Sequence, residues 1–137
     1  MTGLQRLTAV ILLGMMSAAT ASLPPCPDSP NCVSSQATNK DQQVDPIVFV
    51  LPPAQALARL KQVLAGMPRT RLVKEEGGYL HAEVRSFLFR FVDDLEFLVD
   101  NERNLIHMRS ASRTGHSDFG VNRRRVERIR KAFDGLE

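Results

Sequence analysis

The sequence lacks the short motifs that mark common catalytic and nucleotide-binding sites. It contains no glycine-rich phosphate loop, no nucleophile elbow and no dinucleotide fingerprint. Its three histidines, His81, His107 and His116, are scattered, and no two of them have the HxH or HxxxH spacing of zinc ligands. These absences point away from zinc and nucleotide chemistry, and we expect no metal, no cofactor and no assigned catalytic residue.

A strong excess of basic residues is also missing. The chain has 18 basic and 15 acidic residues, and its first 21 residues contain only Arg6, so the remainder has a formal charge of 18 − 1 − 15 = +2. Nucleic-acid-binding domains usually show a larger basic excess. No stretch after residue 21 is apolar enough to cross a membrane. We therefore expect no nucleic-acid partner and no stable membrane span in residues 22–137.

Residues 1–21 have the pattern of an export signal peptide. A short, positively charged start precedes an apolar run over residues 7–19, which is shorter than the roughly 20 residues of a spanning helix. Ala19-Thr20-Ala21 fits the small-x-small cleavage rule, which places the mature start at Ser22. An uncleaved N-terminal anchor is the alternative. The expected location is periplasmic or secreted.

The two cysteines, Cys26 and Cys32, enclose a segment of turn-forming residues. An oxidising compartment favours a disulfide between them, and the turn formers could bring the sulfurs together. A catalytic Cys32 is the alternative, although no sequence signature marks a partner histidine. Residues 22–46 lack sustained periodicity and are interpreted as an extended, cysteine-containing arm or a partly disordered linker.

Residues 47–137 show the periodicities of a single α+β domain. Apolar residues recur every three or four positions after Pro52, as expected for one face of a helix. Apolar and polar residues alternate over residues 79–85, as expected for a half-buried strand. The patterns predict strands over residues 47–51, 71–75, 79–85, 87–99 and 105–109, and helices over about 52–66 and from 119 or 121 to 133.

A turn over residues 101–104 fixes the register of the last two strands. Pairing Asp100 with Leu105 places Glu96 opposite Arg109 and joins apolar residues to apolar residues, and a one-residue slip would spoil both matches. We expect a two-layer α+β fold in β-α-β4-α order. Its mainly antiparallel sheet of four to five strands would carry both helices on one face.

Three acidic residues, Asp93, Asp94 and Glu96, form the acidic motif of the chain. Asp94 and Glu96 share a strand face and could act as a carboxylate pair in acid–base chemistry or cation binding. The structural alternative pairs them with Arg109 and Arg90 across the sheet. Asp93 lies at an apolar position, so it must bulge out or pair with Arg113 or Arg125.

A polar corner follows, where the chain is expected to leave the sheet and enter the last, basic helix. Two arginines with nearby hydroxyls could hold a phosphate or carboxylate, assisted by the helix N-terminus, where Asp118 is the expected cap. The structural alternative is that Arg109 pairs with Glu96, while Arg113 braces the loop to Asp93 or Asp118. The candidate anion-binding residues are Arg109, Ser110, Ser112, Arg113, Asp118, Asn122 and Arg123.

Three separated motifs resemble the DUF1499 family, a domain of unknown function found in bacteria and plastid-bearing eukaryotes. They are the segments over residues 26–35, 91–96 and 109–123, so the resemblance covers nearly all of the chain after residue 21. It implies one small domain, often behind an export signal, and no assigned reaction. The residues that match its motifs are Asn31, Cys32, Ser34, Ser35, Asp93, Asp94, Glu96, Arg109, Ser110, Ser112, Arg113, Asp118, Asn122 and Arg123.

The leading hypothesis is an exported, non-catalytic binding module for a small anionic ligand or an envelope protein. Residues 31–35 would lie against the polar corner formed by residues 109–122. The alternative is a small hydrolase-like envelope enzyme that uses Asp94 and Glu96, or Cys32. A third interpretation is structural: the polar motifs lock the arm, sheet and helix together.

Overall fold

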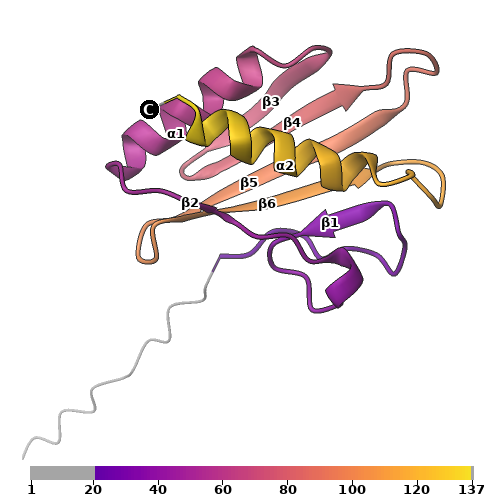
Figure 1. The fold of residues 1–137 in the computed structure, drawn as a ribbon, viewed down its shortest axis with the longest axis horizontal. Helices are drawn as coiled ribbons and strands as arrows, with labels where there is room; N and C mark the ends of the chain where they lie inside the picture. The colour runs from indigo at the N-terminus through magenta and orange to yellow at the C-terminus, as the bar shows by residue number, and fades with distance from the viewer. Residues whose placement is uncertain (1–20, 137) are drawn as a thin grey trace, which may run out of the picture.

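One mainly antiparallel sheet carries the fold in the computed structural model, which describes residues 21–136 (Figure 1). The strand order is β1-β6-β5-β4-β3, and β2 also pairs with β6. The expected export segment, residues 1–21, lies outside the described residues except for Ala21. The strands are β1 (Cys32–Ser34), β2 (Ile47–Val48), β3 (Thr70–Glu76), β4 (Tyr79–Arg85), β5 (Val92–Asp100) and β6 (Leu105–Ser112).

Both helices, α1 (Pro53–Ala65) and α2 (Val121–Asp134), cover the same face of the sheet (Figure 1). Pro53 suits the first turn of α1, where its missing N–H has no helical partner. Each helix buries one apolar stripe, exemplified by Leu60 in α1 and Ile129 in α2, against apolar residues of β4, β5 and β6. The predicted α+β class and the placement of the helices are confirmed.

The predicted register of the last hairpin is also confirmed. Asp100 pairs with Leu105, and Glu96 lies opposite Arg109. The apolar partners Phe97 and Met108 are both fully buried beneath the helices. The pairing of apolar residues therefore fixed the register correctly.

The strand predicted over residues 87–99 begins later than expected. β4 pairs with β5 from Arg85 opposite Val92, so the chain must reverse within the intervening residues. Ser86 closes this β4–β5 loop: its N–H donates to the Phe91 carbonyl at 2.8 Å, and its hydroxyl accepts from the Phe91 N–H at 2.8 Å. The prediction of a strand through Phe87 and Phe89 was wrong because alternation of apolar residues does not distinguish a strand from an exposed turn.

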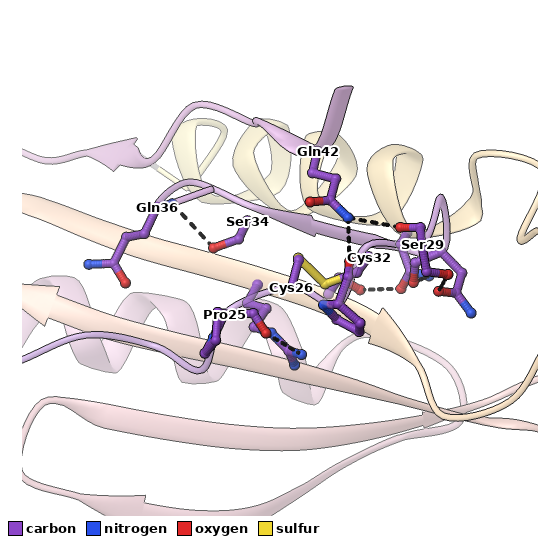
Figure 2. The surroundings of a disulfide bond; sticks show 12 residues. Pro25, Cys26, Ser29, Cys32, Ser34, Gln36 and Gln42 are labelled. Atoms are coloured by element: carbon purple, nitrogen blue, oxygen red, sulfur yellow. Dashed lines mark hydrogen bonds between the residues drawn. A yellow bond between two sulfur atoms is a disulfide. The ribbon is translucent and has the colours of Figure 1, made fainter. Parts of the chain in front are cut away.

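The N-terminal arm contributes β1, a strand that the sequence did not predict. β1 pairs antiparallel with the end of β6, and its Val33 side chain enters the core. Cys26 and Cys32 form the expected disulfide, with their Cα atoms 5.7 Å apart (Figure 2). Gln42, in a short 3-10 helix (Lys40–Gln42), donates to the Pro27 and Ser29 carbonyls at 2.7 and 2.9 Å.

No helix within residues 21–136 combines the length and apolar character needed to span a bilayer.

Candidate functional site

The polar side chains at the end of β6 point alternately to opposite faces of the sheet. The strand continues to Ser112, further than the sequence suggested, so alternate residues point in opposite directions. Ser110 is fully buried on the helix side, whereas Arg109 pairs with Glu96 on the open side. The candidate arginines Arg109 and Arg113 therefore do not share a face with the candidate hydroxyls.

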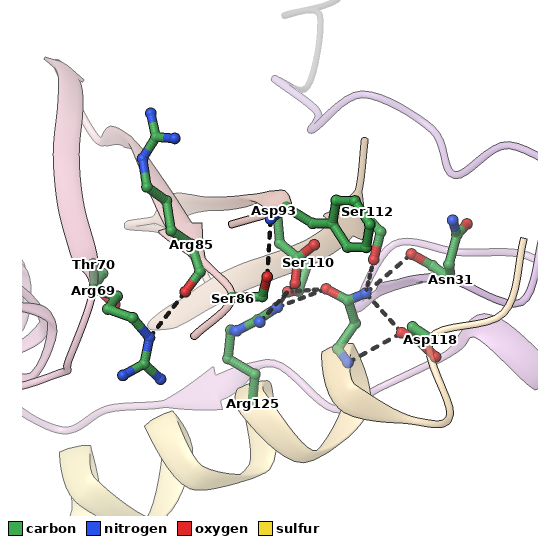
Figure 3. Close-up of polar contacts among 12 residues, drawn as sticks. Asn31, Arg69, Thr70, Arg85, Ser86, Asp93, Ser110, Ser112, Asp118 and Arg125 are labelled. Atoms are coloured by element: carbon green, nitrogen blue, oxygen red, sulfur yellow. Dashed lines mark hydrogen bonds and ion pairs between the residues drawn. The ribbon is translucent and has the colours of Figure 1, made fainter. Parts of the chain in front are cut away.

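Asn122 is the centre of a buried polar cluster on the helix side. Figure 3 labels its partners Ser110, Ser112, Asp118 and Arg125. Its carbonyl oxygen accepts from the Ser110 hydroxyl at 2.6 Å and from Arg125 at 2.8 Å. Its amide group donates to the Ser112 hydroxyl at 2.9 Å, the Asp118 carboxylate at 2.7 Å and the Asn31 carbonyl at 3.1 Å. One side chain thus ties β6, α2, the β6–α2 loop and the arm together.

The buried pair of Arg125 and Asp93 explains the acidic residue at an apolar position. Arg125 donates to the Asp93 carboxylate at 2.7 Å, and both side chains are largely buried. The same guanidinium also donates to Ser110 at 3.0 Å. Of the two partners expected for Asp93, the structure shows Arg125. A buried charge needs such a partner, because an unpaired one is costly to desolvate.

Arg113 binds the acidic motif on the open face. Its guanidinium donates to both carboxylate oxygens of Asp94, at 2.8 and 2.7 Å, and to Glu83 at 3.0 Å. His81 lies 2.7 Å from the same Asp94 carboxylate. The hydrogen bond from Arg113, supported by His81, holds the pKa of Asp94 below its ordinary value although partial burial opposes the shift. Asp94 is therefore an ionised structural anion at neutral pH.

Glu96 is engaged by a second arginine and a tyrosine. Arg109 donates to one oxygen of Glu96 at 2.9 Å, and the Tyr79 hydroxyl donates to the other at 2.6 Å. Burial, followed by the hydrogen bond to Glu96, raises the pKa of Tyr79 well above its usual range, so its hydroxyl remains a donor. The ion pair of Glu96 with Arg109 agrees with the structural alternative for the acidic motif. Asp94 pairs with Arg113 instead of the expected Arg90.

Asp118 stabilises the start of α2 from two residues before the N-cap. Gly120 is the N-cap residue, and its φ of +78° suits glycine. The Asp118 carboxylate accepts from the backbone N–H groups of Gly120 at 2.8 Å and Asn122 at 3.1 Å. Partial burial alone would raise the pKa of Asp118, but the hydrogen bonds from Asn122 and Gly120 outweigh it and lower the pKa. The prediction of Asp118 as the N-cap residue was therefore wrong by two positions, although its carboxylate does accept from exposed N–H groups, and the helix begins at Val121, one of the two expected starts.

The arm lies against this corner, as expected. The Asn31 amide donates to the Gly115 carbonyl at 2.7 Å, and the Ser112 N–H donates to the Asn31 carbonyl at 3.0 Å. Arg123 donates to the carbonyls of Asp41 and Gln43, each at 2.8 Å. Arg123 therefore serves as a brace between α2 and the arm.

A concavity that the sequence did not predict lies beside Arg113, where β3 begins and β4 ends. The register across the Gly77–Gly78 turn places Arg71 opposite Glu83 and brings Arg69 close to Arg85. The register of this hairpin is the feature from which the concavity could have been predicted. The concavity has a volume of about 510 Å³. We call it the arginine cleft; it is lined by Arg69, Thr70, Arg71, Glu83, Arg85, Ser86, Phe87 and Arg90.

The described part of the chain contains neither a cluster of metal-ligating side chains nor a free thiol. Among residues 21–136, no group of three or more His, Cys, Asp or Glu side chains is arranged to hold a metal ion. The disulfide between Cys26 and Cys32 leaves no free thiol.

Comparison with known proteins assigns the family. A family model described as "Protein of unknown function (DUF1499)" matches residues 22–133. No curated protein and no solved structure matches the chain. The family model spans most of the chain, including the arm, the acidic motif and the polar corner, and the chain therefore belongs to the DUF1499 family.

Proposed function

We propose that this protein is an exported, non-catalytic binding module whose arginine cleft binds a ligand bearing phosphate or carboxylate groups. The export part of the proposal is supported by the signal-like pattern of residues 1–21 and by the disulfide between Cys26 and Cys32, a bond that persists in oxidising compartments.

The observation that carries the proposal is the charge of the arginine cleft. It is lined by four arginines and one acid, which gives a local formal charge of 4 − 1 = +3. Glu83 is already engaged by Arg113 at 3.0 Å and Arg71 at 3.5 Å. Within residues 21–136, the guanidinium groups of Arg85 and Arg90 have no ion-pair or hydrogen-bond partner, so their donors are available to a ligand. Guanidinium groups bind phosphates and carboxylates with two parallel hydrogen bonds.

The polar corner acts as the scaffold of this module. Its arginines, serines and asparagine bond to one another, to the acidic motif or to backbone carbonyls. Arg113 connects the corner to the cleft, because it holds Glu83 and Asp94 together. The corner therefore fixes the strands that carry the cleft arginines and keeps Glu83 from neutralising more than one of them.

The geometry favours the hydrolase-like alternative less. Cys32 is consumed by the disulfide. Asp94 is bound by two donors of Arg113 and has a lowered pKa, which makes it a weak base near neutral pH. Glu96 is buried and bonded to Arg109 and Tyr79. Carboxylates that are already paired are suited to holding the sheet together.

Anion binding is tested with pyrophosphate at constant ionic strength, by thermal shift and isothermal titration calorimetry. We expect saturable stabilisation of the wild type. In the Arg85→Gln/Arg90→Gln variant the affinity should fall at least about tenfold, because two charge-assisted hydrogen-bond donors are lost. Arg128→Gln, which removes an exposed arginine of α2, is the matched control and should bind like the wild type.

Two results would contradict the proposal. One is the absence of saturable pyrophosphate binding by the wild type. The other is equal affinity of the wild type and the cleft variant, which would place any anion binding elsewhere on the molecule.

A further inference from the structure

The β4–β5 loop displays a group of large apolar side chains to solvent. Phe87, Leu88, Phe89 and Phe91 are 82%, 73%, 69% and 55% exposed. Isolated exposed apolar residues are ordinary, but a contiguous group of this size on one loop marks a surface that contacts something apolar.

The loop holds these side chains outward through its own bonds. The two hydrogen bonds between Ser86 and Phe91 close its base, and Arg90 adopts a φ of +55°, which turns the chain back toward β5. The Phe89 and Phe91 rings stack with centroids 5.6 Å apart. The hairpin itself therefore holds the apolar side chains in this exposed arrangement.

A fifth exposed apolar side chain lies at the same end of the sheet. β4 ends at Arg85, and β6 ends at Ser112, so the β4–β5 and β6–α2 loops emerge together (Figure 1). Phe119, in the β6–α2 loop, is 86% exposed. We call this end of the molecule, with the two loops and the arginine cleft, the loop end.

Arginines lie next to the apolar residues of the β4–β5 loop. The Arg69 guanidinium lies 5.6 Å from the centre of the Phe87 ring, and Phe87 itself lines the arginine cleft. Arg90 lies within the loop between Phe89 and Phe91. An exposed apolar loop flanked by arginines has the two properties of a peripheral membrane-binding surface: side chains that can enter the acyl boundary and cations that can face lipid phosphates.

We propose that the loop end binds the surface of an anionic lipid bilayer, with Phe87, Leu88 and Phe89 inserted at the interface and the cleft arginines on lipid phosphates. This inference rests on the proposed function, because it assigns the anion of the arginine cleft to a phospholipid headgroup. A free phosphate would leave the phenylalanines in water. A second copy in a two-fold contact would bring each loop end, with its arginines, against an identical positive surface.

Co-flotation with vesicles tests the inference. We expect the wild type to bind vesicles of equimolar phosphatidylglycerol and phosphatidylcholine at least about tenfold more tightly than vesicles of phosphatidylcholine alone. Phe87→Ser/Phe89→Ser should weaken vesicle binding at least about tenfold while pyrophosphate binding remains. Arg85→Gln/Arg90→Gln should weaken both. Val50→Ser, at the 93% exposed Val50 outside the loop end, is the matched control and should change neither.

Fluorescence gives a second readout. The chain contains no tryptophan, so Leu88→Trp provides a single reporter whose emission should shift to the blue on anionic vesicles, whereas Val50→Trp should show no shift. Pyrophosphate binding without vesicle binding would overturn this inference and leave the proposed function standing. Loss of both kinds of binding would overturn both. A concentration-dependent dimer that Phe87→Ser/Phe89→Ser abolishes would identify a second copy as the occupant and also overturn the inference.

Discussion

At the scale of single residues, Asn122 has the largest structural role relative to its size. It is fully buried, and both ends of its amide group are occupied by bonds to separate segments. Buried amides are stable in proteins only when their hydrogen-bonding capacity is used. The burial of Asn122 is therefore tolerated because its partners use its hydrogen-bonding groups, and those partners in turn need Asn122 to satisfy their own.

Asn122→Ala should lower the free energy of unfolding by roughly 3 kcal/mol, because it leaves several buried donors and acceptors without partners. Chemical denaturation followed by circular dichroism measures the effect. Asn101→Ala, in the exposed β5–β6 turn, is the control and should change stability by less than about 0.5 kcal/mol. Equal stability of the two variants would show that the buried polar cluster does not hold the corner together.

The individual ion pairs were only partly predictable. The pair of Glu96 and Arg109 followed from the register of one hairpin, which the sequence specifies locally. The partner of Arg113 did not: we expected Asp93 or Asp118, and the structure shows Asp94 and Glu83. The difference arises because β6 runs on to Ser112, which carries the following arginine to the open face, and no local pattern marks that extension.

At the scale of elements, the disulfide loop fastens the arm to the edge of the sheet. Cys32 lies in β1, and Cys26 follows Leu23, whose side chain is buried. The hydrogen bonds from Gln42 to the Pro27 and Ser29 carbonyls hold the other side of the loop; Gln42 and Ser29 are labelled in Figure 2. The disulfide and the β1 pairing thus support each other.

Opening the disulfide should destabilise the protein without unfolding β3 to β6. A loop of this length contributes about 2 kcal/mol through the entropy of the unfolded chain. A reductant should therefore lower the urea midpoint of the wild type and leave that of Cys26→Ser/Cys32→Ser unchanged. A reductant effect of equal size on both proteins would disprove this role for the disulfide.

Most of the elements that the sequence predicted have long, regular patterns; the strand predicted over residues 47–51 is an exception, since β2 spans only Ile47–Val48. α1, β4, the β5–β6 hairpin and α2 each repeat one periodicity over many residues. β1 was missed because three residues are too few to show a period, and its strand conformation depends on partners in β6. The arginine cleft was missed for a related reason, since its lining comes from β3, β4 and the β4–β5 loop.

At the scale of the whole molecule, hydrogen-bonded carboxylates make the free energy of unfolding depend on pH. Asp94 is held by Arg113 and His81, and Asp118 by Asn122 and Gly120, and both have a folded-state pKa below the ordinary value of 3.8. A depressed pKa stabilises the fold while the pH is above the unfolded value, and this stabilisation is lost as the pH falls toward the folded value.

The free energy of unfolding should therefore change little between pH 7 and about pH 5 through these groups and should fall steadily below about pH 4. Urea denaturation at a series of pH values measures this. Asp94→Asn should be less stable at neutral pH and should lose less on acidification, so that its curve approaches that of the wild type. Two parallel curves would show that Asp94 does not contribute to the acid sensitivity.

The pairing of β1 with the end of β6 also determines the order in which the chain can fold. During synthesis the arm emerges before β6 and α2, yet its strand partner lies in β6, and its Asn31 carbonyl accepts from the Asn122 amide of α2. Contacts between such distant segments form late, because the loop-closure entropy must be offset by structure already in place. The arm should therefore become ordered only after the later segments β6 and α2, and removing α2 should release the arm as well.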